Sequence, residues 1–237
     1  MFCRPSNGGN GGKRFFIYIK KKCIFVKSES GLVVQLNRTS DSGSESRGFE
    51  SLRGHKMDFL KNIDSSWTLF LDRDGVINRR IVNGYVERLS DFQFLHSVPQ
   101  AITLCKKVFA RILVVTNQQG IGKGIMTEEH LSIIHTYLKE QIPEIDKIYH
   151  SPYLICDNNI MRKPNIGMAL AAKKDFSGID FQKSIMVGDS QSDIEFGKNA
   201  NMFTVLISET NFPTSADKVY PSLFDFALDV NKYFTKI

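Results

Sequence analysis

The sequence lacks three features that would place it in other classes of protein. It has no run of about 18 or more apolar residues, the length that a helix needs to span a bilayer, so we expect no membrane segment. The apolar stretch at residues 15–26 is interrupted by three consecutive lysines, Lys20 to Lys22, which argues against a signal peptide. The four cysteines show no framework spacing, which predicts a reducing, cytoplasmic setting.

The larger part of the chain also lacks an excess of charge of either sign. Residues 1–56 carry 11 Lys/Arg against 4 Asp/Glu, whereas residues 57–237 carry 20 against 21. The formal net charge of +6 therefore comes from the first 56 residues. Because nucleic-acid binding needs a basic face on the folded part, we expect no nucleic-acid partner.

Residues 1–56 differ in composition from the rest of the chain. They are rich in glycine, serine, arginine and asparagine, which predicts a disordered basic extension. The segment Arg47–Leu52 is also what the T-arm of a transfer-RNA gene encodes in one reading frame. We therefore hypothesise an over-extended gene model with its true start at Met57, which leaves residues 57–237 as one domain. A nucleotide sequence under residues 28–56 that does not fold into a cloverleaf would contradict this hypothesis.

From Trp67 onwards, apolar runs of strand length alternate with helical patterns. The expected strands are 67–71, 112–115, 145–150, 184–188 and 203–207. The expected helices are 98–109, 127–141, 164–174, 191–199 and a C-terminal packing helix at 220–234. This alternation predicts an α/β three-layer sandwich with a mainly parallel, Rossmann-like sheet. In such sheets ligands bind at the carboxyl ends of the strands.

Polar side chains suited to phosphate chemistry follow three of these strands and precede one helix. They are Asp72 and Asp74 after the first strand, Thr116 after the second, Lys163 before a helix, and Asp189 and Asp193 after a later strand. Two carboxylates this close at a buried strand end are costly unless a cation or a proton relieves their repulsion. Each pattern alone is compatible with a surface turn or a structural residue. Together they predict one site for a divalent cation and a phosphoryl group.

These motifs resemble those of the haloacid-dehalogenase-like (HAD) superfamily of aspartate-nucleophile phosphatases across residues 67–207. The matching segments are Asp-Arg-Asp-Gly at 72–75, Thr-Asn-Gln at 116–118, Gly-Ile-Gly-Lys-Gly at 120–124, Arg-Lys-Pro at 162–164 and Gly-Asp-Ser-x-x-Asp at 188–193. They are similar to the branch that holds D,D-heptose 1,7-bisphosphate phosphatases and histidinol phosphatases. Only a loop, a short strand and one helix fit between Asp74 and Thr116, so we expect no substantial cap domain and an open site.

The resemblance implies a role for each of these side chains. Asp72 would attack phosphorus to form an aspartyl-phosphate, and Asp74 would serve as general acid and base. Thr116 and Lys163 would hold the equatorial oxygens of the phosphoryl group. The protein ligands of the expected Mg²⁺ cofactor would be Asp72, the backbone carbonyl of Asp74, and Asp189. Asp193 would position Lys163 or a metal-bound water.

The resemblance also assigns residues to substrate binding and argues against a zinc loop. The expected substrate contacts are Asn83, Gly84, Tyr85, Asn117, Gln118 and Arg162. Many members of the branch carry a zinc loop, but its ligand positions here are Ser151, Tyr153, Asn159 and Met161. His150 and Cys156 alone cannot complete a tetrahedral site, so we do not expect zinc.

The expected partner is a small phosphorylated metabolite, and three functions stay open. The first is a phosphatase that removes the 7-phosphate of D-glycero-D-manno-heptose 1,7-bisphosphate. The second is histidinol-phosphate phosphatase, and the third is a phosphate-binding protein without catalytic activity. A phosphatase that acts on nucleic-acid ends is a further, minor alternative. The sequence does not fix the oligomeric state, and a monomer is the working expectation.

Overall fold

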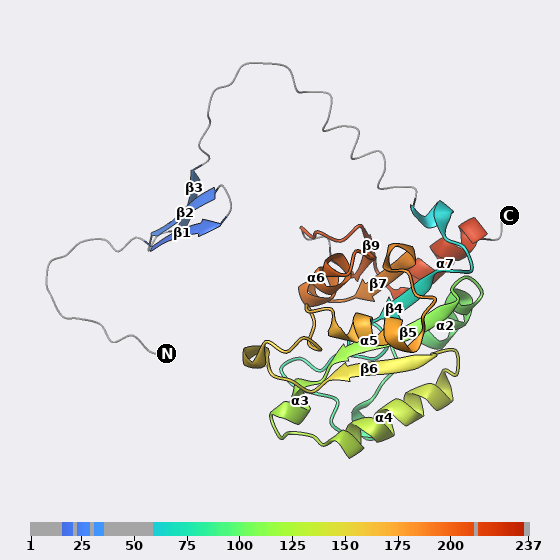
Figure 1. Ribbon diagram of the computed structural model, residues 1–237. Helices are drawn as coiled ribbons and strands as arrows, with labels where there is room; N and C mark the ends of the chain where they lie inside the picture. The colour runs from blue at the N-terminus through green and yellow to red at the C-terminus, as the bar shows by residue number, and fades with distance from the viewer. Residues whose placement is uncertain (1–15, 21–22, 29–30, 36–58, 211–212, 235–237) are drawn as a thin grey trace, which may run out of the picture. The chain divides into compact units, whose positions relative to one another are not determined.

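The computed structural model describes residues 16–20, 23–28, 31–35, 59–210 and 213–234 of the chain, which divides into two units, Met1–Phe49 and Glu50–Ile237 (Figure 1). In the first unit, β1 (Phe16–Lys20), β2 (Cys23–Ser28) and β3 (Gly31–Gln35) form an antiparallel sheet. The expectation of a disordered extension did not include this sheet. The rest of residues 1–56 lies outside the described residues, and the misread start stays a prediction.

The second unit is built on a six-stranded parallel sheet. Its strands are β4 (Thr68–Leu71), β5 (Arg111–Asn117), β6 (Lys147–Ser151), β7 (Ser184–Gly188), β8 (Phe203–Ile207) and β9 (Lys218–Tyr220). They lie in the order β6-β5-β4-β7-β8-β9, and every neighbouring pair is parallel. The chain runs outward from β4 to β6 and then returns to the other side of β4. This reversal opens a crevice at the carboxyl ends of β4 and β7.

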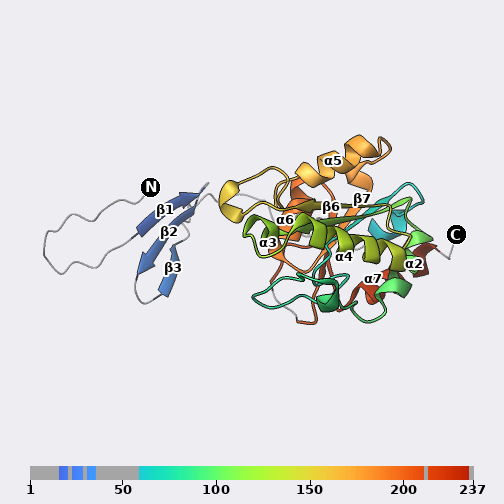
Figure 2. The same cartoon turned by 90° about the horizontal axis from the view of Figure 1, so that it is seen from below.

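Helices cover both faces of this sheet, as Figure 2 shows. On one face lie α2 (Val98–Lys106), α4 (Glu128–Gln141) and α7 (Leu223–Phe234), and on the other lie α5 (Gly167–Asp175) and α6 (Gln191–Asn199). Alternate strand residues point to opposite faces, so Leu69 and Leu71 join the first core and Phe70 joins the second. The predicted α/β three-layer fold is confirmed. Between Asp74 and Thr116, the structure has loops, a short 3₁₀ helix at Leu89–Asp91, and α2.

Four short helices complete the described part of the second unit. They are α3 (Gln119–Gly122) and the 3₁₀ helices η2 (Phe59–Asn62), η4 (Ile155–Asp157) and η5 (Phe181–Lys183), besides η3 (Leu89–Asp91). Thr127 caps α4 by accepting a hydrogen bond from the backbone N–H of His130, at 3.2 Å. No helix in the described ranges is both long enough and apolar enough to cross a membrane.

Three boundaries differ from the sequence prediction by three residues, and the others differ by two residues or fewer. The helix expected at 164–174 begins only at Gly167, because the preceding loop folds back on itself: the Gly167 N–H donates to the carbonyl of Ile160 at 2.9 Å. The C-terminal helix begins at Leu223, since residues 218–220 pair with β8 as the edge strand β9. The helix expected at 98–109 ends at Lys106, where the chain turns towards β5. The strand at 184–188, the helix at 191–199 and the strand at 203–207 match their predicted bounds.

Candidate active site

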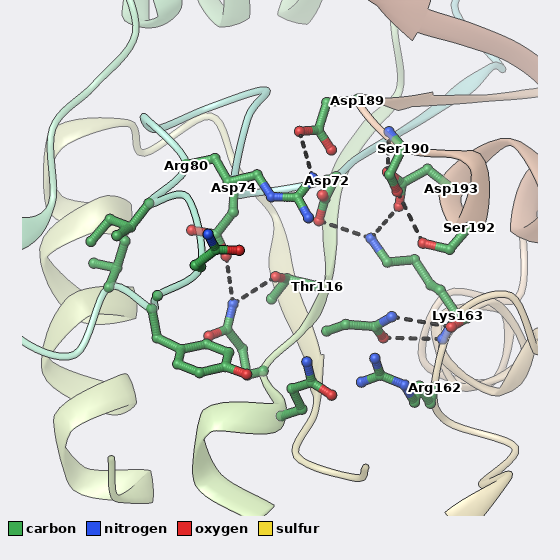
Figure 3. A pocket seen from close by; sticks show the side chains of 18 of the residues that line it. Asp72, Asp74, Arg80, Thr116, Arg162, Lys163, Asp189, Ser190, Ser192 and Asp193 are labelled. Atoms are coloured by element: carbon green, nitrogen blue, oxygen red, sulfur yellow. Dashed lines mark hydrogen bonds and ion pairs between the residues drawn. The ribbon is translucent and has the colours of Figure 1, made fainter. Parts of the chain in front are cut away.

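The carboxyl ends of β4, β5 and β7 open into one cavity of about 570 Å³ (Figure 3). Every residue that the sequence predicted for the site lines it, namely Asp72, Asp74, Asn83, Gly84, Tyr85, Thr116, Asn117, Gln118, Arg162, Lys163, Asp189 and Asp193. The prediction missed eight further lining residues, namely Arg80, Ile81, Val86, Gln119, Lys123, Ile125, Ser190 and Ser192. The separate motifs therefore converge on one place.

Asp72 lies at the base of this cavity, directly after β4. Its backbone N–H donates to the carbonyl of Val187 at 2.9 Å, which extends the pairing of β4 with β7. Its Oδ1 accepts a hydrogen bond from Lys163 Nζ at 2.8 Å. Burial, followed by the neighbouring charge of Asp193, raises the pKa of Asp72 to about 8, despite the opposing effect of Lys163. The site therefore favours a cation close to this carboxylate.

The Lys163 ammonium is buried and has three oxygen neighbours. Nζ lies 2.8 Å from Asp72 Oδ1, 2.6 Å from Asp193 Oδ1 and 2.7 Å from the carbonyl of Val115. Burial alone would lower the pKa of Lys163, but Asp193 and Asp72 outweigh it and the pKa is raised. Asn117 fixes the lysine backbone, since its Oδ1 accepts from the Lys163 N–H at 3.0 Å and its Nδ2 donates to the Lys163 carbonyl at 3.1 Å. Lys163 therefore stays charged in a fixed position.

Two glycines make room for the acid pair after β7. A Cβ on Gly75, whose φ is +94°, would lie 2.0 Å from Asp189 Oδ2. A Cβ on Gly188 would lie 2.1 Å from the Cβ of Asp193. Asp193 also accepts hydrogen bonds from the hydroxyl and backbone N–H of Ser190, at 2.6 and 3.1 Å, at the start of α6. Any side chain at either glycine would displace a carboxylate.

Asp72, Asp189 and Asp193 form a cluster that fits a divalent cation. Each offers a carboxylate oxygen, and the three oxygens lie within 4.8 Å of one another. Burial and Asp193 raise the pKa of Asp189, while Arg80 and Lys163 oppose that rise. A set of hard oxygen ligands suits Mg²⁺. Over the described residues, this is the only cluster of its kind, and it contains neither cysteine nor histidine.

Arg80 reaches the same cluster from the loop after β4. Its Nη1 lies 3.2 Å from Asp189 Oδ2, and most of its side chain is exposed. Figure 3 shows the guanidinium between Asp189 and Asp72. A sequence signal was available in the Arg79-Arg80 pair, which follows the acidic turn by a few residues. However, a basic pair in a loop is typical of a solvated surface and did not single Arg80 out.

The carboxylate of Asp74 is held by three side chains of the protein. Arg73 Nη2 donates to Asp74 Oδ2 at 2.9 Å, Asn78 Nδ2 donates to Oδ1 at 2.9 Å, and Gln118 Nε2 donates to Oδ2 at 2.8 Å. Burial pushes the pKa of Asp74 upward, but the Arg73 charge and these hydrogen bonds outweigh it and lower the pKa. Asp74 is therefore ionised in this structure.

Thr116 and the outer wall of the cavity complete the site. Gln118 Nε2 also donates to Thr116 Oγ1 at 2.8 Å, which leaves the hydroxyl proton of Thr116 free to donate into the cavity. On the wall, Lys123 Nζ lies 5.4 Å from the centre of the Tyr85 ring. Arg162 Nη1 donates to the carbonyl of Tyr153 at 2.9 Å. Together with Arg80, the wall therefore presents an aromatic ring and three cations beside the acidic base of the cavity.

The fold and this arrangement define a phosphohydrolase of the HAD-like class. A family model described as polynucleotide kinase 3 phosphatase matches residues 68–221. The D-glycero-alpha-D-manno-heptose-1,7-bisphosphate 7-phosphatase of Mycobacterium bovis is 34% identical over 174 residues, which cover 69% of this chain and 91% of that protein. The D-glycero-beta-D-manno-heptose-1,7-bisphosphate 7-phosphatase of Escherichia coli is 34% identical over 184 residues, covering 69% of this chain and 93% of that protein.

A solved structure shares the fold. It is the D,D-heptose 1,7-bisphosphate phosphatase of B. bronchiseptica complexed with magnesium and phosphate, with a TM-score of 0.63 and 23% identity, covering 70% of this chain and 98% of that one. The chain belongs to the polynucleotide kinase 3 phosphatase family of HAD-like phosphatases and is a phosphoric monoester hydrolase.

Proposed function

We propose that this phosphatase removes the 7-phosphate of D-glycero-D-manno-heptose 1,7-bisphosphate with Mg²⁺ as cofactor, in the cytoplasm. The observation that carries the proposal is the charge distribution in the cavity. The inner end of the cavity holds the buried Asp72, and the wall carries three cations, Arg80, Lys123 and Arg162. A substrate with one phosphate to lose and a second to anchor fits such a site, because cations bind the phosphate that stays. The names of the M. bovis and E. coli relatives support the same substrate.

In the proposed reaction, Asp72 is the nucleophile. Lys163 holds Oδ1, and the other carboxylate oxygen attacks phosphorus. A bond forms between that oxygen and phosphorus, and the bond from phosphorus to the sugar oxygen breaks. Water then attacks the same phosphorus, which releases inorganic phosphate and regenerates the carboxylate. As charge develops on the phosphoryl oxygens, the Thr116 hydroxyl donates to one of them. The Lys163 ammonium, whose three donors are taken in the resting site, donates to another in place of one of its carboxylate partners.

Asp74 moves the two protons that this sequence requires. It protonates the departing sugar oxygen and then takes a proton from the attacking water. The low pKa of Asp74 in the resting site suits the second of these steps. For the first step, the negative charge of an arriving phosphate raises the pKa of this neighbouring carboxyl. The Arg73 and Gln118 contacts keep it aimed at one place throughout.

Mg²⁺ would be held by Asp72, the backbone carbonyl of Asp74, and Asp189. Asp193, the third carboxylate of the cluster, would position Lys163 or a metal-bound water. When bound, the cation supplies positive charge that lets a phosphate dianion approach these carboxylates and polarises the phosphoryl oxygens. The protein residues around it then bind the substrate and transfer its protons. Arg80, now 3.2 Å from Asp189, is close enough to bind the substrate phosphate instead.

The test of this proposal is a phosphate-release assay with Mg²⁺ on both anomers of the heptose 1,7-bisphosphate and on histidinol phosphate. Both anomers are needed because the two relatives are named for different ones. We expect the largest kcat/KM on a bisphosphate, with ³¹P spectra showing loss of the 7-phosphate. A larger kcat/KM on histidinol phosphate would replace the proposed substrate. No release from any phosphomonoester would favour a phosphate-binding protein.

The second-phosphate subsite has its own test. Lys123→Gln removes one wall cation without touching the acidic base of the cavity, so we expect KM for the bisphosphate to rise about ten-fold at a similar kcat. KM for heptose 7-phosphate, which lacks the second phosphate, should change less than about two-fold. Lys139→Gln, an exposed lysine on α4, is the control. Equal changes for both substrates would remove Lys123 from the subsite.

A further inference from the structure

Arg73, which lies between the two catalytic aspartates in sequence, is completely buried. A buried guanidinium must have hydrogen-bond partners for its donors, because an unpaired buried charge is strongly destabilising. Its Nη2 donates to both oxygens of Asp74, at 3.0 and 2.9 Å, and Nε lies 3.4 Å from Asp74 Oδ1. One side of the guanidinium therefore fixes the carboxylate on two oxygens at once.

The other side of the guanidinium faces a histidine on α4. Arg73 Nη1 lies 3.3 Å from Nε2 of His135. An arginine nitrogen can only donate, so Nε2 must be the unprotonated nitrogen of a neutral ring. Burial, then the charges of Arg73 and His150, lower the pKa of His135 to about 3, which keeps the ring neutral. His135 is thus an acceptor that the charged guanidinium can use without repulsion.

His135 also contacts a second histidine, His150, besides Arg73. Its ring packs edge-on against His150 of β6, with ring centres 5.8 Å apart, and His150 Nε2 lies 2.9 Å from Glu128 Oε2. These side chains line a surface hollow of about 490 Å³ that is separate from the active-site cavity. A chain of contacts therefore runs from this hollow through His135 and Arg73 to Asp74.

We propose that His135 is a positioning residue for the reaction, which by holding the Arg73 guanidinium fixes the Asp74 carboxylate where it can protonate the leaving group. The inference rests on the proposed role of Asp74 as general acid and base. Without the His135 acceptor, one Arg73 donor is left buried and unpaired, and the guanidinium turns to find a partner. Asp74 then keeps its contacts with Asn78 and Gln118 but loses the charged, two-oxygen contact with Arg73 that completes its positioning.

The leaving group separates this role from a general structural one. A sugar alkoxide needs a proton as it departs, whereas 4-nitrophenolate departs without one. The ratio kcat/KM covers only the steps up to departure of the leaving group, so later hydrolysis of the aspartyl-phosphate does not enter it. A variant that misplaces only the general acid Asp74 therefore has a lower kcat/KM for the sugar phosphate and an unchanged kcat/KM for the nitrophenyl ester. Damage to the whole site lowers both.

The experiment measures kcat/KM of wild type, His135→Leu and His135→Gln on the heptose bisphosphate and on 4-nitrophenyl phosphate, with Mg²⁺. We expect His135→Leu to lose about 10- to 100-fold on the sugar phosphate and less than about three-fold on the nitrophenyl ester. His135→Gln, whose amide oxygen can accept from Arg73, should recover most of the loss. His130→Leu, exposed on the same helix, is the control and should behave as wild type.

Equal losses on the two substrates, or no loss from a folded His135→Leu protein, would overturn the inference. If His135→Leu gives no folded protein, His135→Asn takes its place, because its shorter amide does not reach Arg73. A wild type that hydrolyses another alkyl phosphate, but not the heptose bisphosphate, overturns only the proposed substrate, and the comparison is then made on that ester. A wild type inactive on every phosphomonoester overturns the proposed function and this inference with it.

Discussion

The inner end and the outer wall of the active-site cavity are built in different ways. The inner end consists of Asp72, Thr116, Lys163, Asp189 and Asp193, and the outer wall consists of residues 80, 81 and 83–86 with Lys123, Ile125 and Arg162. At the inner end, Lys163 is 3% exposed and Asp193 is fully buried. On the wall, Ile125 is 44% exposed, and Val82, which lies in the same loop as the wall residues Ile81 and Asn83, is 84% exposed. The same cavity thus joins a core-like region to a surface-like one.

This difference explains what each region can do. At the inner end most side chains have several partners, as Lys163 does with its three oxygen neighbours, so their geometry is set before a substrate arrives. Preorganised charges of this kind lower the barrier to phosphoryl transfer. On the wall, Arg80 contacts Asp189, Lys123 lies over the Tyr85 ring and Arg162 contacts the carbonyl of Tyr153, and all three can exchange these partners for a substrate. We infer that reaction type is determined at the inner end and substrate choice on the wall.

The largest effect is expected at the nucleophile. Asp72→Asn should lower kcat by at least about a thousand-fold, because an amide oxygen is a poor nucleophile towards phosphorus. Phosphate release measures this, with a thermal melt in EDTA to check folding. The variant should melt no lower than wild type, since it removes a carboxylate whose charge the site disfavours. Activity above about a tenth of wild type would contradict the division between the two regions.

The next effect concerns the cation. Asp189→Ala should raise the Mg²⁺ concentration needed for half-maximal activity by about ten-fold or more, because one of three clustered carboxylates is lost. A magnesium titration of activity measures this change. Glu129→Ala, which removes an exposed carboxylate on α4, is the control. An unchanged requirement in Asp189→Ala would take this residue out of the metal site.

The inner end was the part that the sequence predicted well. Asp72 follows an apolar run that is typical of a buried strand, and an acid there needs a partner, but this pattern also fits a surface turn and indicates a site only together with the other motifs. A basic pair before a helix is typical of a solvated surface, so Lys163 indicates a phosphate site only together with the other motifs. The direct contact between the Asp72 carboxylate and the Lys163 ammonium depends on β5, which pairs with β4 and whose Asn117 and Val115 hold Lys163.

The wall could not be predicted to the same degree. Arg80 and Lys123 lie in exposed segments, where a basic residue has no periodic pattern and no burial to distinguish it. Asn117 and Gln118 were predicted as substrate contacts and do line the cavity, but their amides also hold Lys163, Asp74 and Thr116. A sequence shows the residue type, whereas the partner depends on how loops from different strands meet.

The third prediction concerns pH in the absence of divalent cations. Asp72 has an ordinary pKa near 4 when unfolded and about 8 when folded, so between these values the folded state binds more protons. The contribution of Asp72 to the free energy of unfolding should therefore fall as pH rises from about 4 to about 8. The raised pKa of Lys163 acts only at more alkaline pH. Chemical denaturation in EDTA at several pH values should show a flatter profile for Asp72→Asn than for wild type. Parallel profiles would contradict the raised pKa.

The smallest effect is expected on the wall, where two valines of one loop provide a matched pair. Val82 is 84% exposed, whereas Val86 is 2% exposed and belongs to the core beneath. Val82→Ser should change the free energy of unfolding by less than about 0.5 kcal/mol, as surface substitutions usually do. Val86→Ser should cost about 1–3 kcal/mol, because it buries a hydroxyl in an apolar site. Urea denaturation measures both. Equal costs would mean that the loop is as tightly packed as the inner end, and the wall would then not be free to adapt to its substrate.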